Sequence, residues 1–207
     1  MKNIVVTIGR QYGSGGKEIG KKLAEAMGVT FYDEELVTMA AENSNLDKDV
    51  LGKVDENATG SLLYSLVMSG GLRGLATPMY YEMPLNDKLF IAQSDAIKKI
   101  AKEGSAVIVG RCADYVLSGE DVTTLNVFLY ADMDYKIERI MRLYDLNQKA
   151  AKDRIVKTEK QRRTYYNYYT NKDWGEMGSY DLCLDVSKMG TDMAVAVIRD
   201  IVEELKK

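Results

Sequence analysis

Histidine is absent from the 207 residues of this chain, and its absence excludes several kinds of chemistry. A Ser-His-Asp triad, a histidine general base and a histidine-ligated metal all need an imidazole. The two cysteines, Cys112 and Cys183, are too few for a thiolate zinc site or a disulfide framework. Such sparse cysteine is typical of a reducing compartment, and we expect a cytoplasmic protein.

Long apolar segments and an excess of positive charge are missing as well. No hydrophobic run approaches the ~20 residues that cross a bilayer, and Ile4 to Ile8 is too short a run for the core of a signal peptide. The formal net charge of −3 argues against binding nucleic acid through bulk charge. We therefore expect neither a membrane nor a nucleic acid as a partner.

Five short apolar segments have the composition of buried strands. They lie near 3–8, 29–32, 106–109, 125–130 and 181–186. Helical patterns alternate with them, at about 19–27, 33–41, 86–103, 132–169 with an interruption near 146–147, and 191–205. This alternation predicts an α/β fold, a three-layer sandwich in which helices cover both faces of a five-stranded parallel sheet.

A glycine-rich loop between the first strand and the first helix is the most specific local signal. It consists of Gly9-Arg10-Gln11-Tyr12-Gly13-Ser14-Gly15-Gly16-Lys17-Glu18. Its glycines and Ser14 allow backbone N–H groups to face an anion at the start of a helix, and Lys17 adds a point charge. The alternative is a tight strand-to-helix turn in an α/β protein that binds no nucleotide.

The loop departs from the usual phosphate-binding pattern, G-x-x-x-x-G-K-[ST], in either of two registers. In one register Gly16-Lys17 is the G-K pair. Gln11 then replaces the first glycine, and Glu18 replaces the hydroxyl that binds magnesium. In the other register, set by the helix that follows, Gly16 occupies the lysine position and Lys17 falls one residue later. Because each register lacks one expected group, we expect Arg10 to share the phosphate charge.

Polar residues also follow the second and third strands, whose carboxyl ends lie at the working edge of a parallel sheet. Arg111 comes just after the third strand, and its planar guanidinium suits a phosphate or carboxylate. Asp114 lies three residues further on, where it can accept a hydrogen bond from a base or sugar. Asp33 ends the second strand and is placed to orient an acceptor. A helix-end salt bridge for Arg111 and simple helix capping for Asp33 are the alternatives.

Basic residues gather in one helical stretch of this otherwise acidic chain. They are Arg139, Arg142, Arg154, Lys157, Lys160, Arg162 and Arg163. The stretch is either a solvated charged face or a mobile cationic cover over transferring phosphates. The tyrosine-rich segment 165–169 and Trp174 follow it. They suit stacking on a nucleobase, packing at the sheet edge, or a homodimer contact.

These segments together resemble the cytidylate-kinase-like proteins, a branch of the P-loop nucleoside monophosphate kinases. The resemblance rests on four segments that occur in the same order, 7–19, 31–36, 107–114 and 165–174. It implies a P-loop kinase core of about 1–43, 104–144 and 178–207, a helical acceptor-binding insert of about 44–103 and a lid of about 145–177.

Together with the chemistry of the loop, the resemblance assigns roles to individual residues. Those expected to hold ATP are Arg10, Gly13, Ser14, Gly15, Gly16, Lys17 and Glu18. Those expected to bind the acceptor are Asp33, Arg111 and Asp114. Those expected to assist phosphoryl transfer are Lys17, Arg111, Arg139, Arg154 and Arg162.

The implied activity is phosphoryl transfer from ATP, with Mg²⁺, to a nucleoside monophosphate, and CMP or dCMP is the expected acceptor. Two departures from cytidylate kinases leave alternatives open. Val109 stands where those enzymes have an acid, and Glu18 or Ile19 stands where the loop hydroxyl is wanted. A P-loop module that binds a nucleotide without turnover and a kinase with a non-nucleotide acceptor are the alternatives. The metal ligands are not assigned, and Thr191 is one candidate.

Overall fold

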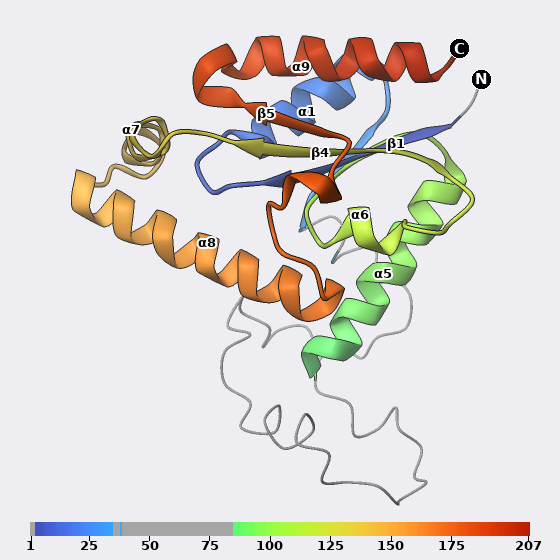
Figure 1. Cartoon of the computed structure of the whole chain (residues 1–207), viewed down its shortest axis with the longest axis horizontal. Coiled ribbons are helices and arrows are strands. Elements are labelled where there is room, and N and C mark those ends of the chain that lie inside the picture. Colours follow the sequence, from blue (N-terminus) through green and yellow to red (C-terminus); the bar gives the residue numbers. More distant parts are fainter. Residues whose placement is uncertain (1–2, 35–37, 39–84) are drawn as a thin grey trace, which may run out of the picture.

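The computed structural model describes residues 3–34, 38 and 85–207, whose arrangement is drawn in Figure 1. A parallel sheet with the strand order β2-β3-β1-β4-β5 lies at the centre. Its strands are β1 (Ile4–Arg10), β2 (Thr30–Tyr32), β3 (Ala106–Val109), β4 (Thr123–Tyr130) and β5 (Leu182–Asp185). Because every pair of neighbours is parallel, the carboxyl ends of all five strands meet at one edge.

Helices cover both faces of the sheet. One face carries α1 (Gly16–Met27) and α9 (Val186–Leu205), which pack side by side (Figure 1). The other face carries α5 (Leu85–Glu103) and the short α6 (Ala113–Val116). Beyond the carboxyl ends of the strands stand α7 (Met133–Tyr144) and α8 (Gln148–Thr170), and a 3₁₀ turn, η1 (Met177–Ser179), precedes β5. The α/β sandwich with a five-stranded parallel sheet is confirmed.

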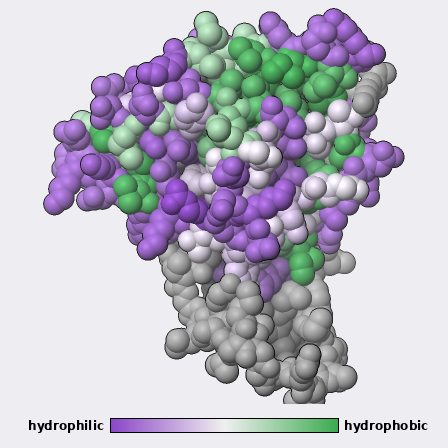
Figure 2. All heavy atoms as spheres, viewed as in Figure 1, coloured by the Kyte–Doolittle hydropathy of each residue, from purple (hydrophilic) through white to green (hydrophobic). Residues whose placement is uncertain are grey.

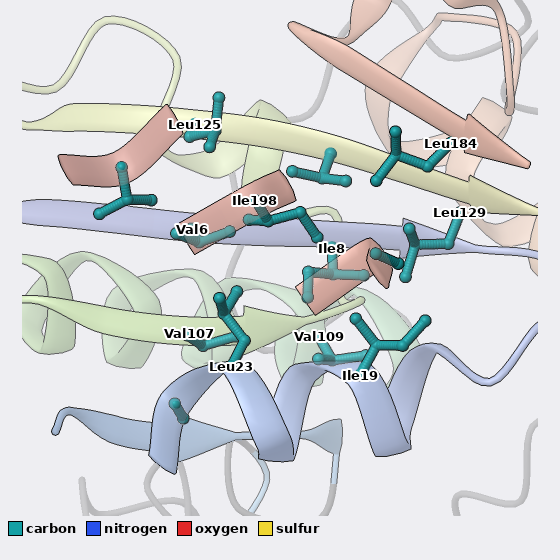
Figure 3. Close-up of a cluster of buried hydrophobic side chains, with 14 of the residues drawn as sticks. Val6, Ile8, Ile19, Leu23, Val107, Val109, Leu125, Leu129, Leu184 and Ile198 are labelled. Atoms are coloured by element: carbon teal, nitrogen blue, oxygen red, sulfur yellow. The ribbon is translucent and has the colours of Figure 1, made fainter. Parts of the chain in front are cut away.

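The central strand β1 is apolar along most of its length because both of its sides are covered. Val6 and Ile8 point into the layer formed by α1 and α9, where Ile19 belongs to the same cluster (Figure 3). Val5 and Ile108 belong to the cluster on the opposite face. Each of these side chains is at most 1% exposed, and burying one contributes roughly 1.5–3 kcal/mol. This core holds the end of β1 and the start of α1, between which the glycine-rich loop runs.

The helices end at residues that the sequence marks. α1 ends at Gly28, whose φ of 64° is the left-handed conformation that glycine adopts without strain. Asp145 ends α7 in the same conformation, and Asn147 caps α8 by accepting a hydrogen bond from the Ala150 amide at 2.9 Å. The interruption predicted near 146–147 is therefore confirmed. It lets α8 leave α7 in a new direction and run toward α5 (Figure 1).

Two expected elements differ in extent or lie beyond what is described. The sequence predicts the last helix over 191–205, whereas α9 begins at Val186 and is kinked at Gly190, with φ 75° and ψ 170°. The helix expected over 33–41 lies mostly outside the described residues. Of the expected acceptor-binding insert, about 44–103, residues 44–84 also lie outside the described residues, so the role of the insert stays a prediction.

The face of the molecule in Figure 2 is mostly hydrophilic, and hydrophobic residues gather beside α9. Within the described ranges, no helix is both long enough and apolar enough to cross a membrane.

Candidate functional site

A cleft of about 800 Å³ opens at the carboxyl ends of β1, β2 and β3. Such a volume lies within the range of small-molecule sites, ~300–1,000 Å³. Most of the predicted site residues line it, namely Arg10, Gly13, Gly15, Gly16, Lys17, Glu18, Asp33, Arg111, Asp114, Arg139 and Arg162. Ser14 and Arg154 are predicted site residues that do not line the cleft.

The glycine-rich loop presents backbone rather than side chains to the cleft. Gly13 and Gly15 adopt left-handed φ angles of 87° and 90°, which glycine tolerates and other residues rarely adopt. α1 begins at Gly16 without a side-chain cap, so its first amides suit an anion. Ser14 is fully buried, and its hydroxyl donates to the Gln11 carbonyl at 2.9 Å. Ser14 therefore shapes the loop, and the helix start offers the anion-binding geometry.

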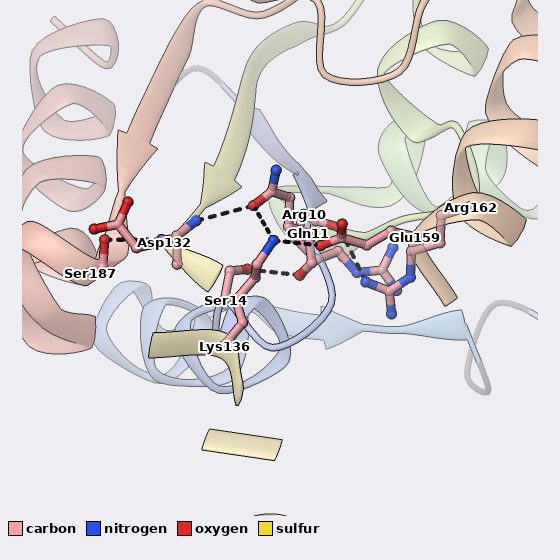
Figure 4. A network of polar contacts seen from close by, with 9 residues as sticks. Arg10, Gln11, Ser14, Asp132, Lys136, Glu159, Arg162 and Ser187 are labelled. Carbon is pink, nitrogen blue, oxygen red and sulfur yellow. Dashed lines mark hydrogen bonds and ion pairs between the residues drawn. The ribbon is translucent and has the colours of Figure 1, made fainter. Parts of the chain in front are cut away.

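A buried lysine of α7, Lys136, supports the loop (Figure 4). Only 4% of this residue is exposed, and its Nζ lies 3.1 Å from Gln11 Oε1 and 2.9 Å from Glu159 Oε1. A Cβ on Gly13 would lie 3.1 Å from the Cβ of Lys136, so the loop packs directly on this side chain. Gln11 Oε1 also accepts from the Ala131 amide at 3.2 Å. Lys136 thus ties the loop to both α7 and α8.

The burial of Lys136 is not apparent from the sequence, because a lysine on an amphipathic helix usually faces solvent. The available signal is its place four residues before Ile140, on the buried face of α7. A cation on that face needs a partner, and Glu159 of α8 provides one.

Lys17 and Asp33 form an ion pair in which Nζ lies 2.7 Å from Oδ2. The Asp33 side chain follows β2 and is 10% exposed, whereas the Lys17 side chain is 68% exposed. The pair joins a residue expected on the donor side to one expected on the acceptor side. A ligand that contacts either group has to compete with this pair, and the roles of both residues stay predictions.

The turn after β3 holds Arg111 on a strained backbone. Gly110, Arg111 and Cys112 have consecutive positive φ angles of 87°, 55° and 54°. This conformation costs a non-glycine residue roughly 1–2 kcal/mol, and such strain clusters at functional sites. The Arg111 guanidinium forms an ion pair with Glu34 and lies 5.4 Å from the centroid of the Tyr165 ring. A salt bridge is thus present at a residue that also lines the cleft.

One donor atom of Arg111 is left without a partner by the described residues. Its Nε is buried and makes no hydrogen bond to any of them. A buried donor in this state costs about 1–3 kcal/mol, so an acceptor atom is favoured beside it. An oxygen of a phosphate or carboxylate ligand would supply that acceptor.

Two ionisable side chains follow Arg111, the buried Cys112 and the half-buried Asp114. Burial raises the pKa of the Cys112 thiol, which makes Cys112 a packed residue rather than a nucleophile. Burial also raises the pKa of Asp114, and a hydrogen bond from the Tyr166 hydroxyl at 2.6 Å lowers it in part. That bond connects α6 to α8 at the wall of the cleft.

The three arginines expected to clamp phosphates make different contacts. Arg139 Nη2 lies 2.5 Å from Glu18 Oε2, and this contact lowers the pKa of Glu18. Arg162 Nη1 donates to the last carbonyl of β1 at 3.1 Å (Figure 4). Arg154 Cζ lies 3.8 Å from the centroid of the Tyr144 ring. Arg139 and Arg162 therefore line the cleft, whereas Arg154 stacks on an aromatic ring next to it.

The tyrosine-rich end of α8 packs against α5. Tyr169 stacks on Phe90, with ring centroids 4.0 Å apart and planes 8° from parallel. Tyr165 meets both rings edge-on, and the Tyr169 hydroxyl donates to Asp87 at 3.0 Å. These contacts explain the cluster within one chain, and the homodimer stays a prediction.

Comparison with known proteins agrees with this geometry. A model of the cytidylate kinase-like family matches residues 5–188. The chain belongs to this family. The cytidylate kinase of Methanopyrus kandleri is 24% identical over 211 residues, which cover 98% of this chain and 95% of the relative. The cytidylate kinase of Methanothrix thermoacetophila is 25% identical over 202 residues, which cover 95% and 98% respectively.

Solved structures share the fold of this cytidylate kinase-like chain. A crystal structure of a protein from Eubacterium ventriosum has a TM-score of 0.72 at 28% identity and covers 97% of this chain and 98% of its own. Shikimate kinase from Bacteroides thetaiotaomicron has a TM-score of 0.52 at 14% identity, with the same coverage. The second likeness shows the fold alone. The resemblance inferred from the sequence is confirmed.

Kinases of this family are expected to use Mg²⁺ with ATP, and such an ion is usually held by one or two protein oxygens together with the phosphates and water. Mg²⁺ prefers oxygen ligands such as carboxylates. Near the loop, Glu18 is held by Arg139 and Lys22, and Asp33 is held by Lys17. In the described part of the chain, no group of three or more histidine, cysteine or acidic residues could hold a metal.

Proposed function

We propose that this chain transfers the terminal phosphoryl group of ATP to a nucleoside monophosphate, with CMP or dCMP as the preferred acceptor. Family membership supports a nucleotide kinase, and two relatives aligned along nearly the whole chain are named cytidylate kinases. The observation that carries the proposal is one cleft that contains both an uncapped helix start and the buried Nε of Arg111, to which no described residue offers an acceptor.

The donor side of the proposed site is made of backbone. The first amides of α1 and the positive end of its dipole stabilise the phosphates of ATP. Gly13 and Gly15 lack side chains, so phosphates can approach the loop closely. Arg139 and Arg162 line the same cleft and neutralise phosphate charge.

The acceptor side is made of side chains. The guanidinium of Arg111 binds the phosphate of the acceptor, which replaces Glu34 as its partner and satisfies Nε. Asp114 accepts a hydrogen bond from the base or sugar, and Asp33 orients the acceptor. Both carboxylates line the cleft.

The transfer itself asks little covalent chemistry of the protein. An oxygen of the acceptor phosphate forms a bond to the γ-phosphorus of ATP, and the bond from that phosphorus to the bridging oxygen of ADP breaks. A phosphate monoester has already lost most of its second proton at neutral pH, so no protein base is needed. The chain therefore works by positioning and charge neutralisation, which is consistent with its lack of histidine.

ADP release from ATP and Mg²⁺ tests the proposal, with CMP, dCMP, UMP, AMP and GMP offered one at a time. We expect CMP or dCMP to stimulate release far more than the others. Stimulation by a different monophosphate would keep the kinase and change its acceptor. If none of them stimulates release while ATP still raises the melting temperature, the proposal of a nucleoside monophosphate as acceptor is wrong.

Binding of a nucleotide without turnover is the second candidate, and two observations favour it. Val109, where cytidylate kinases have an acid, is 1% exposed in the core. The carboxylate of Glu18 is also held by Arg139 and Lys22. A chain of this kind would bind ATP in the thermal-shift control and release no ADP with any acceptor.

A further inference from the structure

The space beside the first residue of α1 is filled by the side chain of Arg10. A Cβ built on Gly16 would lie 2.7 Å from both Cβ and Cγ of Arg10, and 3.6 Å from its Cδ. The aliphatic part of the Arg10 side chain, here called its stem, therefore runs along the α-carbon of Gly16. Any larger residue at position 16 would have to displace it.

The other end of the same side chain lies against the turn that follows β3. A Cβ built on Gly110 would collide with Nη1 of Arg10 and would lie 2.9 Å from its Cζ. Gly110 also donates its amide to the Ile8 carbonyl at 3.1 Å, which holds the ends of β1 and β3 together. Two glycines far apart in the sequence thus make room for one arginine, whose guanidinium lies between the donor loop and Arg111.

The backbone of Arg10 is held in place on both sides. Its carbonyl accepts a hydrogen bond from Arg162 Nη1 at 3.1 Å. The next residue, Gln11, donates its amide to the Leu129 carbonyl at 2.9 Å, and the side chain of Gln11 is held by Lys136 (Figure 4). The guanidinium of Arg10 is therefore aimed from a firmly anchored residue, as a phosphate ligand needs to be.

The side chain of Lys17 leaves α1 in a different direction from that of Arg10 and ends at Asp33. Lys17 is the second residue of α1, and successive helical side chains diverge by about 100° around the axis. Its Nζ lies 2.7 Å from Asp33 Oδ2, and its side chain is 68% exposed. Both side chains line the cleft, but the one that starts beside Gly16 and ends against Gly110 belongs to Arg10, whereas that of Lys17 ends at Asp33.

We propose that Arg10 supplies the phosphate-binding charge that a loop lysine supplies in other P-loop proteins, and that Gly16 and Gly110 are glycines in order to admit its side chain. This assignment rests on the proposed function only in that the cleft takes ATP. In this assignment Lys17 forms an ion pair with Asp33 on the acceptor side of the cleft. A planar guanidinium can hold two phosphate oxygens at once, whereas an ammonium is a point charge, so lysine is not equivalent at position 10.

Binding of ATP without an acceptor tests the assignment by calorimetry. Arg10→Met keeps the stem that covers Gly16 and removes the charged head, and we expect it to weaken ATP about 10- to 100-fold. Lys17→Met should change ATP binding by less than about threefold because that side chain is mostly exposed. Arg199→Ala, at an exposed arginine of α9, is the matched control for loss of one positive charge and should bind like the wild type.

The double variant Arg10→Gly with Gly16→Lys moves the charge from the strand to the helix. Glycine at position 10 removes both Cβ and Cγ, the two atoms that would lie 2.7 Å from a Cβ at position 16, and we expect the double variant to bind ATP at least about tenfold more tightly than Arg10→Gly alone. Inorganic triphosphate should show the same order among the variants. Adenosine, which has no phosphate, should show no difference between the wild type and Arg10→Met.

Several results would overturn the assignment. A loss with Lys17→Met as large as that with Arg10→Met would do so, and so would wild-type binding of triphosphate by Arg10→Met. Failure of the double variant to regain affinity, with its melting temperature within a few degrees of that of Arg10→Gly, would also contradict the assignment. Because none of these measurements needs an acceptor, a chain that turns over no monophosphate still tests Arg10. A wild-type chain that binds neither ATP nor triphosphate would refute both proposals.

Discussion

Two regions of the proposed site each follow a buried strand: the glycine-rich loop 9–18, here called the donor loop, and the turn 110–112, here called the acceptor turn. Both contain left-handed backbone, but different kinds of residue adopt it. In the donor loop, Gly13 and Gly15 take the positive φ angles, which glycine does without strain. In the acceptor turn, Arg111 and Cys112 take them, at roughly 1–2 kcal/mol each. The donor loop needs bare backbone near a phosphate. The acceptor turn needs the side chain of Arg111, so it bears the strain.

The two regions also differ in how they are held. The donor loop is supported by the buried ion pair of Lys136 and Glu159, and its anion-binding amides carry no side-chain cap. The charged groups on the acceptor side are already engaged, Arg111 with Glu34 and Asp33 with Lys17. Under the proposed function, a donor would meet a preformed cradle, whereas an acceptor would have to exchange existing ion pairs. Selectivity is then expected to depend on the acceptor side.

The largest expected effect comes from breaking the support of the donor loop. Lys136→Met removes the partner of Glu159, whose side chain is 16% exposed, and leaves Gln11 without one of its donors. Breaking a fully buried pair costs about 3–5 kcal/mol, and the partial exposure of Glu159 puts the expected loss at the lower end of that range. Urea unfolding should show this loss, and calorimetry should show weaker ATP binding in the variant that remains folded.

A second variant separates stability from positioning. Lys136→Met combined with Glu159→Leu removes both charges, and we expect it to recover most of the unfolding free energy. ATP binding should recover less, since Gln11 still lacks the ammonium that orients it. Full recovery of both quantities would mean that Lys136 only stabilises the fold.

The next effect belongs to the acceptor side. Arg111→Ala should lower kcat/KM for the monophosphate about 100-fold and leave the affinity for ATP within about threefold of the wild type. Steady-state kinetics and ATP calorimetry check the two halves of this statement. Arg111→Lys keeps the positive charge but loses the planar guanidinium, so its kcat/KM for the monophosphate should lie between those of the wild type and Arg111→Ala. Equal losses for donor and acceptor would erase the distinction between the two sides.

The smallest effect concerns Asp114 and depends on pH. The hydroxyl of Tyr166 stabilises the charged carboxylate and so opposes the rise in the pKa of Asp114 that burial causes. Tyr166→Phe removes this bond and should cost about 1.5 kcal/mol of unfolding free energy where Asp114 is ionised. The loss should be full above the raised pKa of Asp114 and fade as the pH falls below it, since the carboxyl is then protonated.

Urea unfolding of the wild type and Tyr166→Phe, at neutral pH and again in mild acid, measures that difference. Asp114→Asn is the matched control, because it cannot titrate and its amide oxygen can still accept from Tyr166. When Tyr166→Phe is added to the Asp114→Asn variant, its effect should not depend on pH. A loss that is the same at both pH values with Asp114 present would contradict the assignment.

Local sequence signals predict much of the fold for identifiable reasons. β1 and β3 are continuous apolar runs because both of their faces are buried, which only a covered parallel strand requires. Gly28 and Asn147 mark helix ends through short-range chemistry that neighbouring residues cannot easily override. The sequence places the last helix start too late, because a kink at Gly190 separates its first turn from the rest.

The candidate site was only partly visible in the sequence. The positions of Arg111, Asp33 and the glycine-rich loop follow from the rule that parallel strands present their carboxyl ends at one edge, and they do line one cleft. Lys136 was hidden, because its burial depends on Glu159, a residue of another helix. The register of the loop also stayed open in the sequence.

The sequence by itself determined the order of strands and helices along the chain, the glycine-rich loop and the family, because these depend on local periodicity and on residues close together in the chain. Only the tertiary structure decided which charged groups meet. Lys17 pairs with Asp33, Arg111 with Glu34, and the stem and head of Arg10 lie against Gly16 and Gly110. The physical reason is that contacts between distant segments are set by packing across the sheet, which no local pattern encodes.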